Sequence, residues 1–387
     1  YVLLSSFWYI NDGRLDFVEL AQKYIGTVMK YNVTTEDGYI LKLYRIPGKG
    51  PSVLLSHGIL DTSDGFMARG NTSLAYILAK KGYDVWVLNY RGNRYSRRHK
   101  TLNPDTDKAY WQFSMQEKGY YDLSAIIDFL LESTGRTKVN VIGHSEGTAT
   151  VFLLIATRPE YTSKINIFIA LSPVCYLSDS GLVVTTAVRL GPIINALLMA
   201  TGIEETLGYY SVSRKLLQLL CLQGTVGYDL CLKVGLSVII GYYPDNLEQA
   251  FWPTFLGHYL AGGSRKELNH YLQIGKKDVF GQYDYGSKKN MEVYGTETAP
   301  IYELKNVKIN VSLVIAKNDK IFGLAAGNRL RGELPNVVDY YVVEDKQFTH
   351  GDFVYGRNAH EYLYPHLTEL LTKYNKNHRF LLLTQKP

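Results

Sequence analysis

Cysteine is scarce, and the few cysteines are not arranged as metal ligands. The 387-residue chain contains only Cys175, Cys221 and Cys231. It has no Cys-x-x-Cys pair and no histidine-rich cluster, so we expect neither a metal site nor a cofactor. Cys221 and Cys231 are close enough in sequence to close a small disulfide loop in an oxidising compartment. Cys175 would then remain as a buried free thiol.

Long apolar runs and strongly basic tracts are also missing. No uninterrupted apolar run is long enough to cross a bilayer, so we expect no transmembrane segment. The net charge of +6 is mild for this length, and no basic tract with interleaved aromatic residues points to nucleic acid as a partner. We expect the basic cluster from Arg91 to Lys100 to be a solvated loop. The short apolar stretch at Tyr1 fits either a processed N-terminus or the remnant of a targeting segment.

Short apolar runs alternate with helical patterns over the first half of the chain. Residues 53–55, 85–88, 139–142 and 167–171 have the continuous apolar character of buried parallel strands. Helical periodicity lies between them, at 74–78 and 123–131. A hairpin precedes them, with strands at 31–34 and 39–44 around an acidic turn that ends in glycine. This order predicts an α/β fold with a mostly parallel sheet covered by helices on both faces.

The alternation stops near residue 175 and resumes near residue 300. The intervening stretch is mostly helical, and residues 182–200 and 216–240 are strongly apolar. A strand at 311–316, a helix at 324–334, a strand at 338–343 and a final helix at 360–374 follow. We therefore expect one core domain, formed by residues 1–175 and 297–387, interrupted by a helical cap at 176–296.

A Gly-x-Ser-x-Gly pentapeptide directly follows the strand predicted at 139–142. Gly143, Ser145 and Gly147 form this motif, and a helix-like stretch begins immediately after it. A sharp strand-to-helix turn would expose the serine oxygen above the sheet, and glycines on either side would avoid steric clashes. Ser145 is therefore the candidate nucleophile.

A serine nucleophile needs a histidine base and a carboxylate that orients the histidine. In this kind of fold the order along the chain is serine, acid, histidine. Asp319 follows the strand at 311–316 and His350 follows the strand at 338–343, so both can reach the sheet edge where Ser145 lies. Asp345 and Asp352 are competing acids, although Asp345 is too close to His350 and Asp352 fits an anchor for the histidine loop.

The tetrahedral intermediate of acyl transfer needs two N–H donors. The residue after the nucleophile, Glu146, is expected to supply one backbone N–H, and Leu60, in the loop after the strand at 53–55, the other. We expect His57 to orient this loop and His144 to pack against the site or line it. The remaining histidines, which fall in the cap or near the final helix, are expected to be structural or exposed.

The chain resembles the acid lipase family, which includes gastric and lysosomal lipases and their insect relatives. The resemblance covers nearly the whole chain and is carried by matching segments at 35–41, 45–47, 57–61, 89–93, 113–114, 121–123, 127–129, 143–148, 318–319 and 350–353. It is lowest in the cap.

The resemblance implies an α/β-hydrolase core, a cap with a movable lid, and hydrolysis of neutral lipid esters such as triacylglycerols or steryl esters. It carries Ser145, Asp319 and His350 over as the triad, with the Leu60 and Glu146 N–H groups as the oxyanion hole. It also implies a Cys221–Cys231 disulfide, a secreted or lysosomal location, and contact with a lipid–water interface. Glycans are then expected at Asn32 and Asn71, whereas a third acceptor motif, at Asn310, begins a buried strand. The oligomeric state is left open.

Two positions depart from the family pattern. The family has Gln where this chain has Glu146, and a leucine where this chain has Gly351. These departures and the abundance of tyrosine motivate an alternative, a lipase-like protein that binds or stores lipid with little turnover. An ionised Glu146 would oppose negative charge on the oxyanion, whereas a protonated one would resemble Gln. Glu146→Gln is therefore expected to raise activity more at neutral than at acidic pH.

Overall fold

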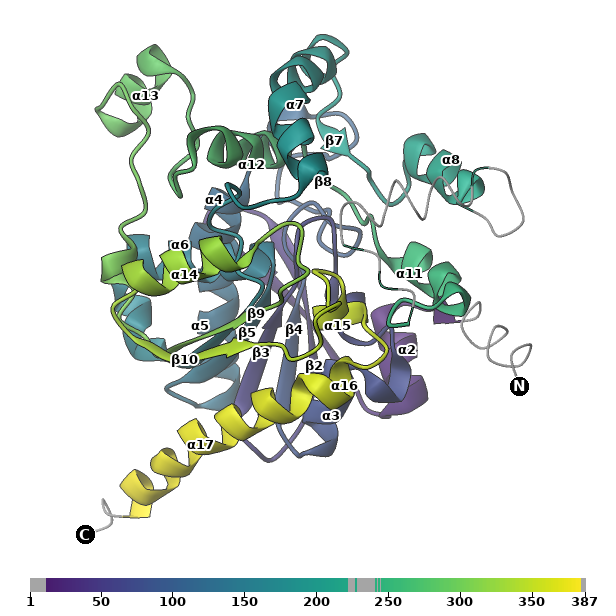
Figure 1. The fold of residues 1–387 in the computed structure, drawn as a ribbon, viewed down its shortest axis with the longest axis vertical. Coiled ribbons are helices and arrows are strands. Elements are labelled where there is room, and N and C mark those ends of the chain that lie inside the picture. The colour runs from purple at the N-terminus through teal and green to yellow at the C-terminus, as the bar shows by residue number, and fades with distance from the viewer. Residues whose placement is uncertain (1–11, 222–226, 228–240, 242, 244, 384–387) are drawn as a thin grey trace.

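An eight-stranded sheet organises the protein (Figure 1). The computed structural model describes residues 12–221, 227, 241, 243 and 245–383. In spatial order the strands are β1 (Met29–Thr34), β2 (Ile40–Ile46), β4 (Asp84–Leu88), β3 (Ser52–Ser56), β5 (Val139–His144), β6 (Ile165–Leu171), β9 (Val311–Ile315) and β10 (Val337–Val342). The β1–β2 and β2–β4 pairs are antiparallel and the other pairs are parallel. Every strand predicted from the sequence is confirmed.

Helices cover both faces of the sheet, each over its own apolar core. One face carries α2 (Phe17–Tyr24), α3 (Leu74–Lys80) and α17 (Tyr364–Leu383), and the other α5 (Ser124–Thr134), α6 (Glu146–Thr157) and α14 (Leu324–Glu333). Shorter helices and turns connect them: η1 (Ser63–Phe66), η2 (Gly70–Thr72), η3 (Lys108–Trp111), α4 (Met115–Glu117), η4 (Lys118–Leu123), η5 (Pro159–Lys164), η8 (Leu304–Asn306), α15 (Asp352–Tyr355) and α16 (Ala359–Tyr362).

The final helix differs from the prediction of one helix at 360–374. The chain forms α16 first, leaves the helix at Leu363, and begins α17 at Tyr364. Pro365 explains the interruption, because proline has no N–H to donate and is accommodated in the first turn of a helix but not in its interior.

The segment between β6 and β9 is mostly helical and lies beyond one end of the sheet (Figure 1). It contains α7 (Leu182–Ala200), α8 (Val212–Leu220), η7 (Gln249–Phe251), α11 (Trp252–His258), α12 (Arg265–Lys277) and α13 (Ser287–Tyr294), with β7 (Glu205–Thr206) paired to β8 (Gly263–Ser264). The helix expected at 182–200 is confirmed, whereas most of the one expected at 216–240 lies outside the described residues. We keep the name cap for this segment, and its boundaries stay a prediction.

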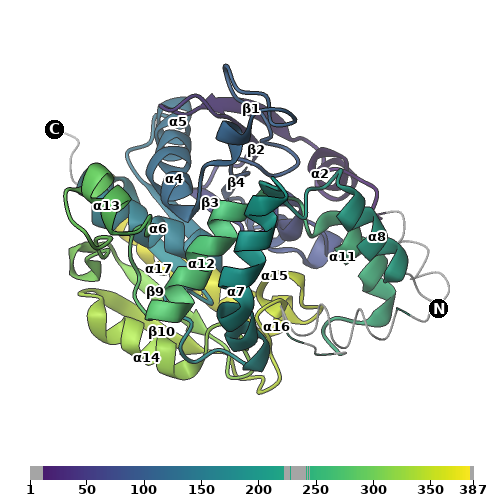
Figure 2. The same ribbon diagram turned by 90° about the horizontal axis from the view of Figure 1, so that it is seen from above.

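Helices α7 and α12 pack side by side across the top of the sheet (Figure 2). Their contact is close, because a Cβ atom at Gly191 would lie 2.4 Å from a methyl group of Leu272. The opposite side of α7 is exposed and apolar: Leu182, Ile193 and Leu197 are 80%, 70% and 64% exposed. By length and composition α7 would suffice to cross a membrane, but a single helix that passes this test is weak support for a span.

The structure describes two of the three cysteines. Cys175 is a buried free thiol, as predicted. Cys221 is disulfide-bonded, and its predicted partner, Cys231, lies outside the described residues.

The expectation of a solvated basic loop is wrong at Arg91 and Arg94. Their guanidinium groups are buried in ion pairs with three carboxylates: the partly exposed Asp37 and the buried Asp64 and Asp122.

Candidate active site

The turn between β5 and α6 holds Ser145 in a strained backbone conformation. Its φ and ψ are 54° and −122°, outside the regions that L-residues favour. The Ser145 N–H donates to the Leu171 carbonyl at the end of the neighbouring strand β6, at 3.0 Å. The serine is therefore fixed at the carboxyl end of the parallel strands, where this fold collects its reactive groups.

Two glycines allow the turn to be this tight. A Cβ atom at Gly143 would lie 2.6 Å from the Gly147 carbonyl oxygen, and one at Gly147 would lie 2.3 Å from the Ser56 carbonyl oxygen. Both contacts are with backbone atoms, which cannot rotate away as a flexible side chain can. The two glycines are therefore required by the packing of α6 against β5 and β3.

The structure brings Ser145, His350 and Asp319 together from three strand ends. The Nε2 atom of His350 lies 2.9 Å from Ser145 Oγ, and its Nδ1 atom lies 2.9 Å from Asp319 Oδ2. The other oxygen of Asp319 accepts the backbone N–H groups of Ile321 and Phe322, at 2.8 and 3.0 Å. In this arrangement an imidazole can take the serine proton while the carboxylate holds the imidazole in the correct tautomer.

The Asp319 carboxylate is kept ionised although it is buried. Burial raises its pKa, but the electrostatic interaction with His350 and the hydrogen bonds from His350 and Ser172 outweigh this effect. The pKa of Asp319 is therefore held below its usual value. An ionised acid at this point stabilises the imidazolium that forms when His350 accepts the serine proton.

Ser172 is a member of the site that the sequence reasoning missed. Its hydroxyl donates a hydrogen bond to Asp319 Oδ2, the same oxygen that faces His350. The hydroxyl also lies 2.8 Å from His350 Nδ1. Ser172 directly follows β6, so the rule that located Asp319 and His350, a polar residue in the segment after a strand, would have found it.

Two backbone N–H groups near Ser145 have no acceptor among the described residues, those of Leu60 and Glu146. Glu146 is the first residue of α6, so its N–H has no partner within the helix. Leu60 has a left-handed conformation with φ of 57°. Its loop runs close to the nucleophile, because a Cβ atom at Gly58 would lie 3.1 Å from the Cβ of Ser145. The Glu146 N–H thus adjoins the serine, and the Leu60 N–H belongs to the loop that approaches it, so the oxyanion role of both stays a prediction.

The other two histidines at the site are neutral and structural. His57 accepts the Tyr90 N–H at Nε2 and donates to the Gly58 carbonyl from Nδ1, and burial lowers its pKa to about 3. His144 donates from Nε2 to the carbonyl of His350, at 3.0 Å, and burial likewise lowers its pKa to about 3. His57 thus holds the Leu60 loop and His144 the histidine loop.

The competing acids do not reach His350 in the way that Asp319 does. Asp345 accepts the N–H of Gln347 within its own loop. Asp352 accepts the N–H and the hydroxyl of Thr349, at 2.7 and 2.8 Å, and so anchors the turn that carries His350. This anchoring role for Asp352 was expected from the sequence.

The glycan candidates differ in exposure. Asn32 and Asn71 are exposed, whereas Asn310 is half-buried and hydrogen-bonded to Asn166 and Asn336.

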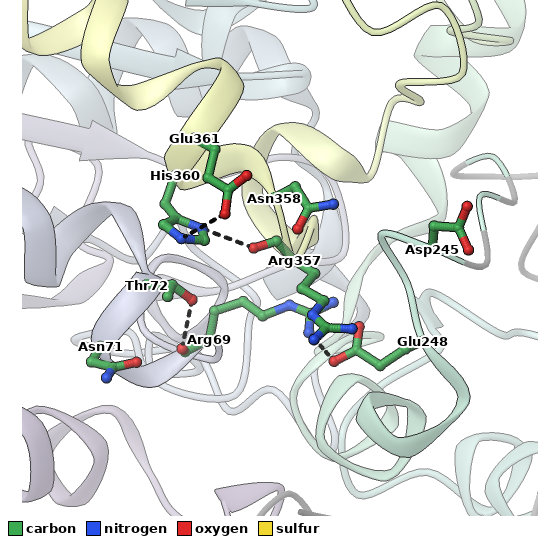
Figure 3. Close-up of a pocket in the computed structure, with 9 residues that line it drawn as sticks. All are labelled: Arg69, Asn71, Thr72, Asp245, Glu248, Arg357, Asn358, His360 and Glu361. Carbon is green, nitrogen blue, oxygen red and sulfur yellow. Dashed lines mark hydrogen bonds and ion pairs between the residues drawn. The ribbon is translucent and has the colours of Figure 1, made fainter.

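Asn71 borders a polar depression of about 720 Å³ in which Arg69 reaches across to Glu248 of the cap (Figure 3). No member of the triad lines this depression, so it is separate from the candidate active site.

Comparisons with known proteins identify the family. A family model described as a partial alpha/beta-hydrolase lipase region matches residues 17–70, and one for the alpha/beta hydrolase fold matches residues 51–189. Lipase 1 of Drosophila melanogaster is 36% identical over 372 residues, which cover 94% of this chain and 81% of that protein. The chain belongs to this lipase family.

Other members of the lipase family match over a similar length. Mouse gastric triacylglycerol lipase is 32% identical, over 89% of this chain and 88% of that protein, and human lipase member K is 31% identical, over 90% and 88%. A thermophilic esterase from Thermogutta terrifontis superposes with a TM-score of 0.51 at 14% identity, covering 89% of this chain and 99% of its own. The last comparison concerns the fold alone. The predicted α/β-hydrolase fold and the family resemblance are confirmed.

Proposed function

We propose that this member of the lipase family hydrolyses carboxylic esters of neutral lipids through an acyl-enzyme on Ser145. The observation that carries the proposal is the hydrogen-bonded chain from Ser145 Oγ through His350 to Asp319. The relatives at 30% identity or more that bear the name triacylglycerol lipase support the substrate class.

The reaction follows from the geometry of the site. His350 Nε2 takes the proton of Ser145 Oγ as the oxygen attacks the ester carbonyl, and Asp319 stabilises the resulting imidazolium. The N–H groups of Leu60 and Glu146 donate to the oxyanion of the tetrahedral intermediate. His350 then protonates the leaving alcohol. In the second half-reaction it activates a water molecule that releases the fatty acid and restores the serine hydroxyl.

The cap offers an apolar space suited to an acyl chain. A cavity of about 280 Å³ lies between α7 and α12. Tyr271 lines this cavity, and Glu146 of the nucleophile turn is one of the groups that raise the pKa of Tyr271. Most of the remaining lining residues are apolar: Leu177, Val184, Ala187, Val188, Ile194, Leu198, Leu268 and Leu272. Apolar lining of this kind binds long hydrocarbon chains by removing them from water.

The outer surface of α7 supports contact with a lipid–water interface, because its exposed apolar side chains form a patch that water solvates poorly.

The relatives support a secreted or lysosomal location. In that setting we expect a Cys221–Cys231 disulfide and glycans at Asn32 and Asn71, whose side chains are exposed. The cap comprises residues 176–296 in this proposal.

Release of fatty acid from emulsified triolein and from cholesteryl oleate, measured from acidic to neutral pH, tests the function. We expect the wild-type chain to release fatty acid from at least one of the two esters, and the Ser145→Ala variant to lose the activity by a factor of about 10⁴ or more. Tight binding of both esters by a wild-type chain that releases no fatty acid would instead support a lipid-binding or storage role.

A further inference from the structure

Three buried ionisable side chains meet next to the nucleophile turn. Lys118 Nζ lies 3.1 Å from Glu146 Oε2 and forms a second ion pair with the carboxylate of Glu267. The side chain of Lys118 is 3% exposed, and those of the two glutamates are completely buried. Lys118 begins η4 and Glu146 begins α6, whereas Glu267 comes from α12 of the cap. The cluster therefore ties the cap to the helix that follows Ser145.

The cluster holds two carboxyl groups but only one ammonium group. The carboxyl groups of Glu146 and Glu267 meet at one ammonium group, because Lys118 Nζ contacts an oxygen of each. Glu146 Oε1 and Glu267 Oε2 nevertheless have no hydrogen-bond donor among the described residues. Two buried carboxylates beside a single ammonium would leave one negative charge uncompensated, which is costly in a low-dielectric interior. One proton between the two carboxyl groups removes this charge and supplies the missing hydrogen bond.

The protonation states of the neighbouring groups agree with a single shared proton. Burial and the proximity of Glu267 raise the pKa of Glu146 well above its usual value. Burial alone would lower the pKa of Lys118, but the two glutamates raise it, so the ammonium stays charged.

Among the described residues, one histidine and three tyrosines face the cluster, and none of the four is charged at neutral pH. Burial lowers the pKa of His57 to about 3 and raises the pKa of each facing tyrosine above its usual value, so all of them are neutral: His57, Tyr90, Tyr259 and Tyr271. The net charge of the cluster is therefore set by Lys118, Glu146 and Glu267.

The same stretch of the cap contacts both candidate oxyanion donors. The Ala261 N–H donates to the carbonyl of Leu60, at 2.8 Å. A Cβ atom at Gly263 would lie 2.8 Å from Glu267 Oε2 and 3.1 Å from a methyl group of Leu60, so these two side chains converge on Gly263. Glu267 in turn meets the side chain of Glu146, whose backbone supplies the other N–H.

We propose that Glu146 and Glu267 share one proton beside Lys118, and that this neutral cluster fixes the oxyanion hole from the cap and sets the upper pH limit of activity. The inference rests on the proposed serine hydrolase function. Lys118 and Glu267 act as positioning residues, because neither touches the reacting atoms. When the shared proton is lost, a net negative charge lies next to the N–H groups that must stabilise an oxyanion. The rate of acyl transfer then falls.

The test compares the pH profile of kcat/KM for a soluble ester, p-nitrophenyl butyrate, in four proteins. They are the wild type, Glu146→Gln, Glu267→Gln and the matched control Glu204→Gln. Glu204 also pairs with a residue of α12, Arg265, but does not belong to the cluster. Either variant within the cluster leaves one carboxylate paired with Lys118 and no shared proton. We expect both to move the alkaline decline of kcat/KM upward by about one pH unit or more, and the control to leave it unchanged.

An infrared difference spectrum keeps this inference separate from the proposed function. A protonated carboxylic acid has a carbonyl stretching band that a carboxylate lacks. We expect wild type minus Glu267→Gln and wild type minus Glu146→Gln to show this band at neutral pH, whether or not the chain turns over an ester. A missing band overturns the shared proton, as does an alkaline decline that moves in Glu146→Gln alone. If the carboxylic acid band is present but the chain hydrolyses no ester, the result contradicts the proposed function and supports the shared proton.

Discussion

Ser172 extends the triad by one hydrogen bond. Its hydroxyl donates to Asp319 and lies 2.8 Å from His350 Nδ1, so it restrains the acid and the base together. Ser172 itself is held by its backbone, in a left-handed conformation with φ of 48° and with its N–H on the Val314 carbonyl. A residue that holds two reactive partners in register affects the rate without touching substrate.

We expect Ser172→Ala to lower kcat by about 10- to 100-fold, because a hydrogen bond to a charged group contributes about 1.5–3 kcal/mol. The KM for a soluble ester should change little. The matched control is Ser312→Ala, which removes the same kind of serine-to-aspartate hydrogen bond, at 2.6 Å, to Asp339, whose histidine partner is His366 and not His350. If both variants retained full kcat, Ser172 would have no part in holding the triad.

The strand–turn–helix element around Ser145 requires a position without a side chain as well as a reactive serine. Gly147 faces the backbone of β3 so closely that any side chain would have to displace it. Gly332, in α14, has no atom within 4 Å of the position that a Cβ would take. These two helical glycines therefore separate the packing requirement of the turn from the general cost of glycine in a helix.

We expect Gly147→Ala to destabilise the protein by about 1–3 kcal/mol or more, through overpacking against β3. Gly332→Ala should be neutral or stabilise the protein by up to about 1 kcal/mol, because alanine loses less conformational entropy in a helix. Denaturant unfolding of the two variants measures both values. Equal stabilities of the two variants would mean that the turn tolerates a side chain at position 147.

The sequence predicted the strands and the turn that have a clear local pattern. It did not predict the side-chain contacts between elements that lie far apart in the chain. The buried strands are continuous apolar runs, so all the core strands and the turn at Ser145 were found. Asp319 and His350 were found because each lies in the segment that follows a predicted strand. Lys118 and Glu267 were missed, because two charged residues far apart in the chain show no pattern until η4 and α12 pack against α6. The buried Arg91 was mistaken for a surface residue for the same reason, since its partners Asp37 and Asp122 are brought to it only by the fold.

At the scale of the whole molecule, buried carboxyl groups make stability depend on pH. Burial raises the pKa of Asp61 and of Asp352 to about 7. Below about pH 4, the usual pKa of aspartate, these groups are protonated in the folded and unfolded states alike. Between about pH 4 and 7 only the unfolded state ionises, so rising pH favours unfolding. Above pH 7 both states are ionised and this contribution is constant.

We expect Asp352→Asn and Asp61→Asn each to reduce the loss of unfolding free energy between pH 4.5 and pH 7, relative to wild type. A single site contributes at most about 1.4 kcal/mol per pH unit in this window. Urea unfolding at a series of pH values measures the slope, and the difference between wild type and variant cancels the contributions of other groups. Parallel stability curves for wild type and both variants would show that neither carboxyl is protonated in the folded state at neutral pH.

The central claim is that Ser145 is an activated nucleophile. An alkyl phosphonate ester, which phosphonylates an activated serine hydroxyl, tests it most directly when the labelled protein is analysed by peptide mass spectrometry. We predict a single adduct on the peptide that contains Ser145, no adduct in Ser145→Ala, and labelling slowed by about 10³-fold or more in His350→Ala. Absence of the adduct from the folded wild-type chain, or an adduct that persists in Ser145→Ala, would contradict the account.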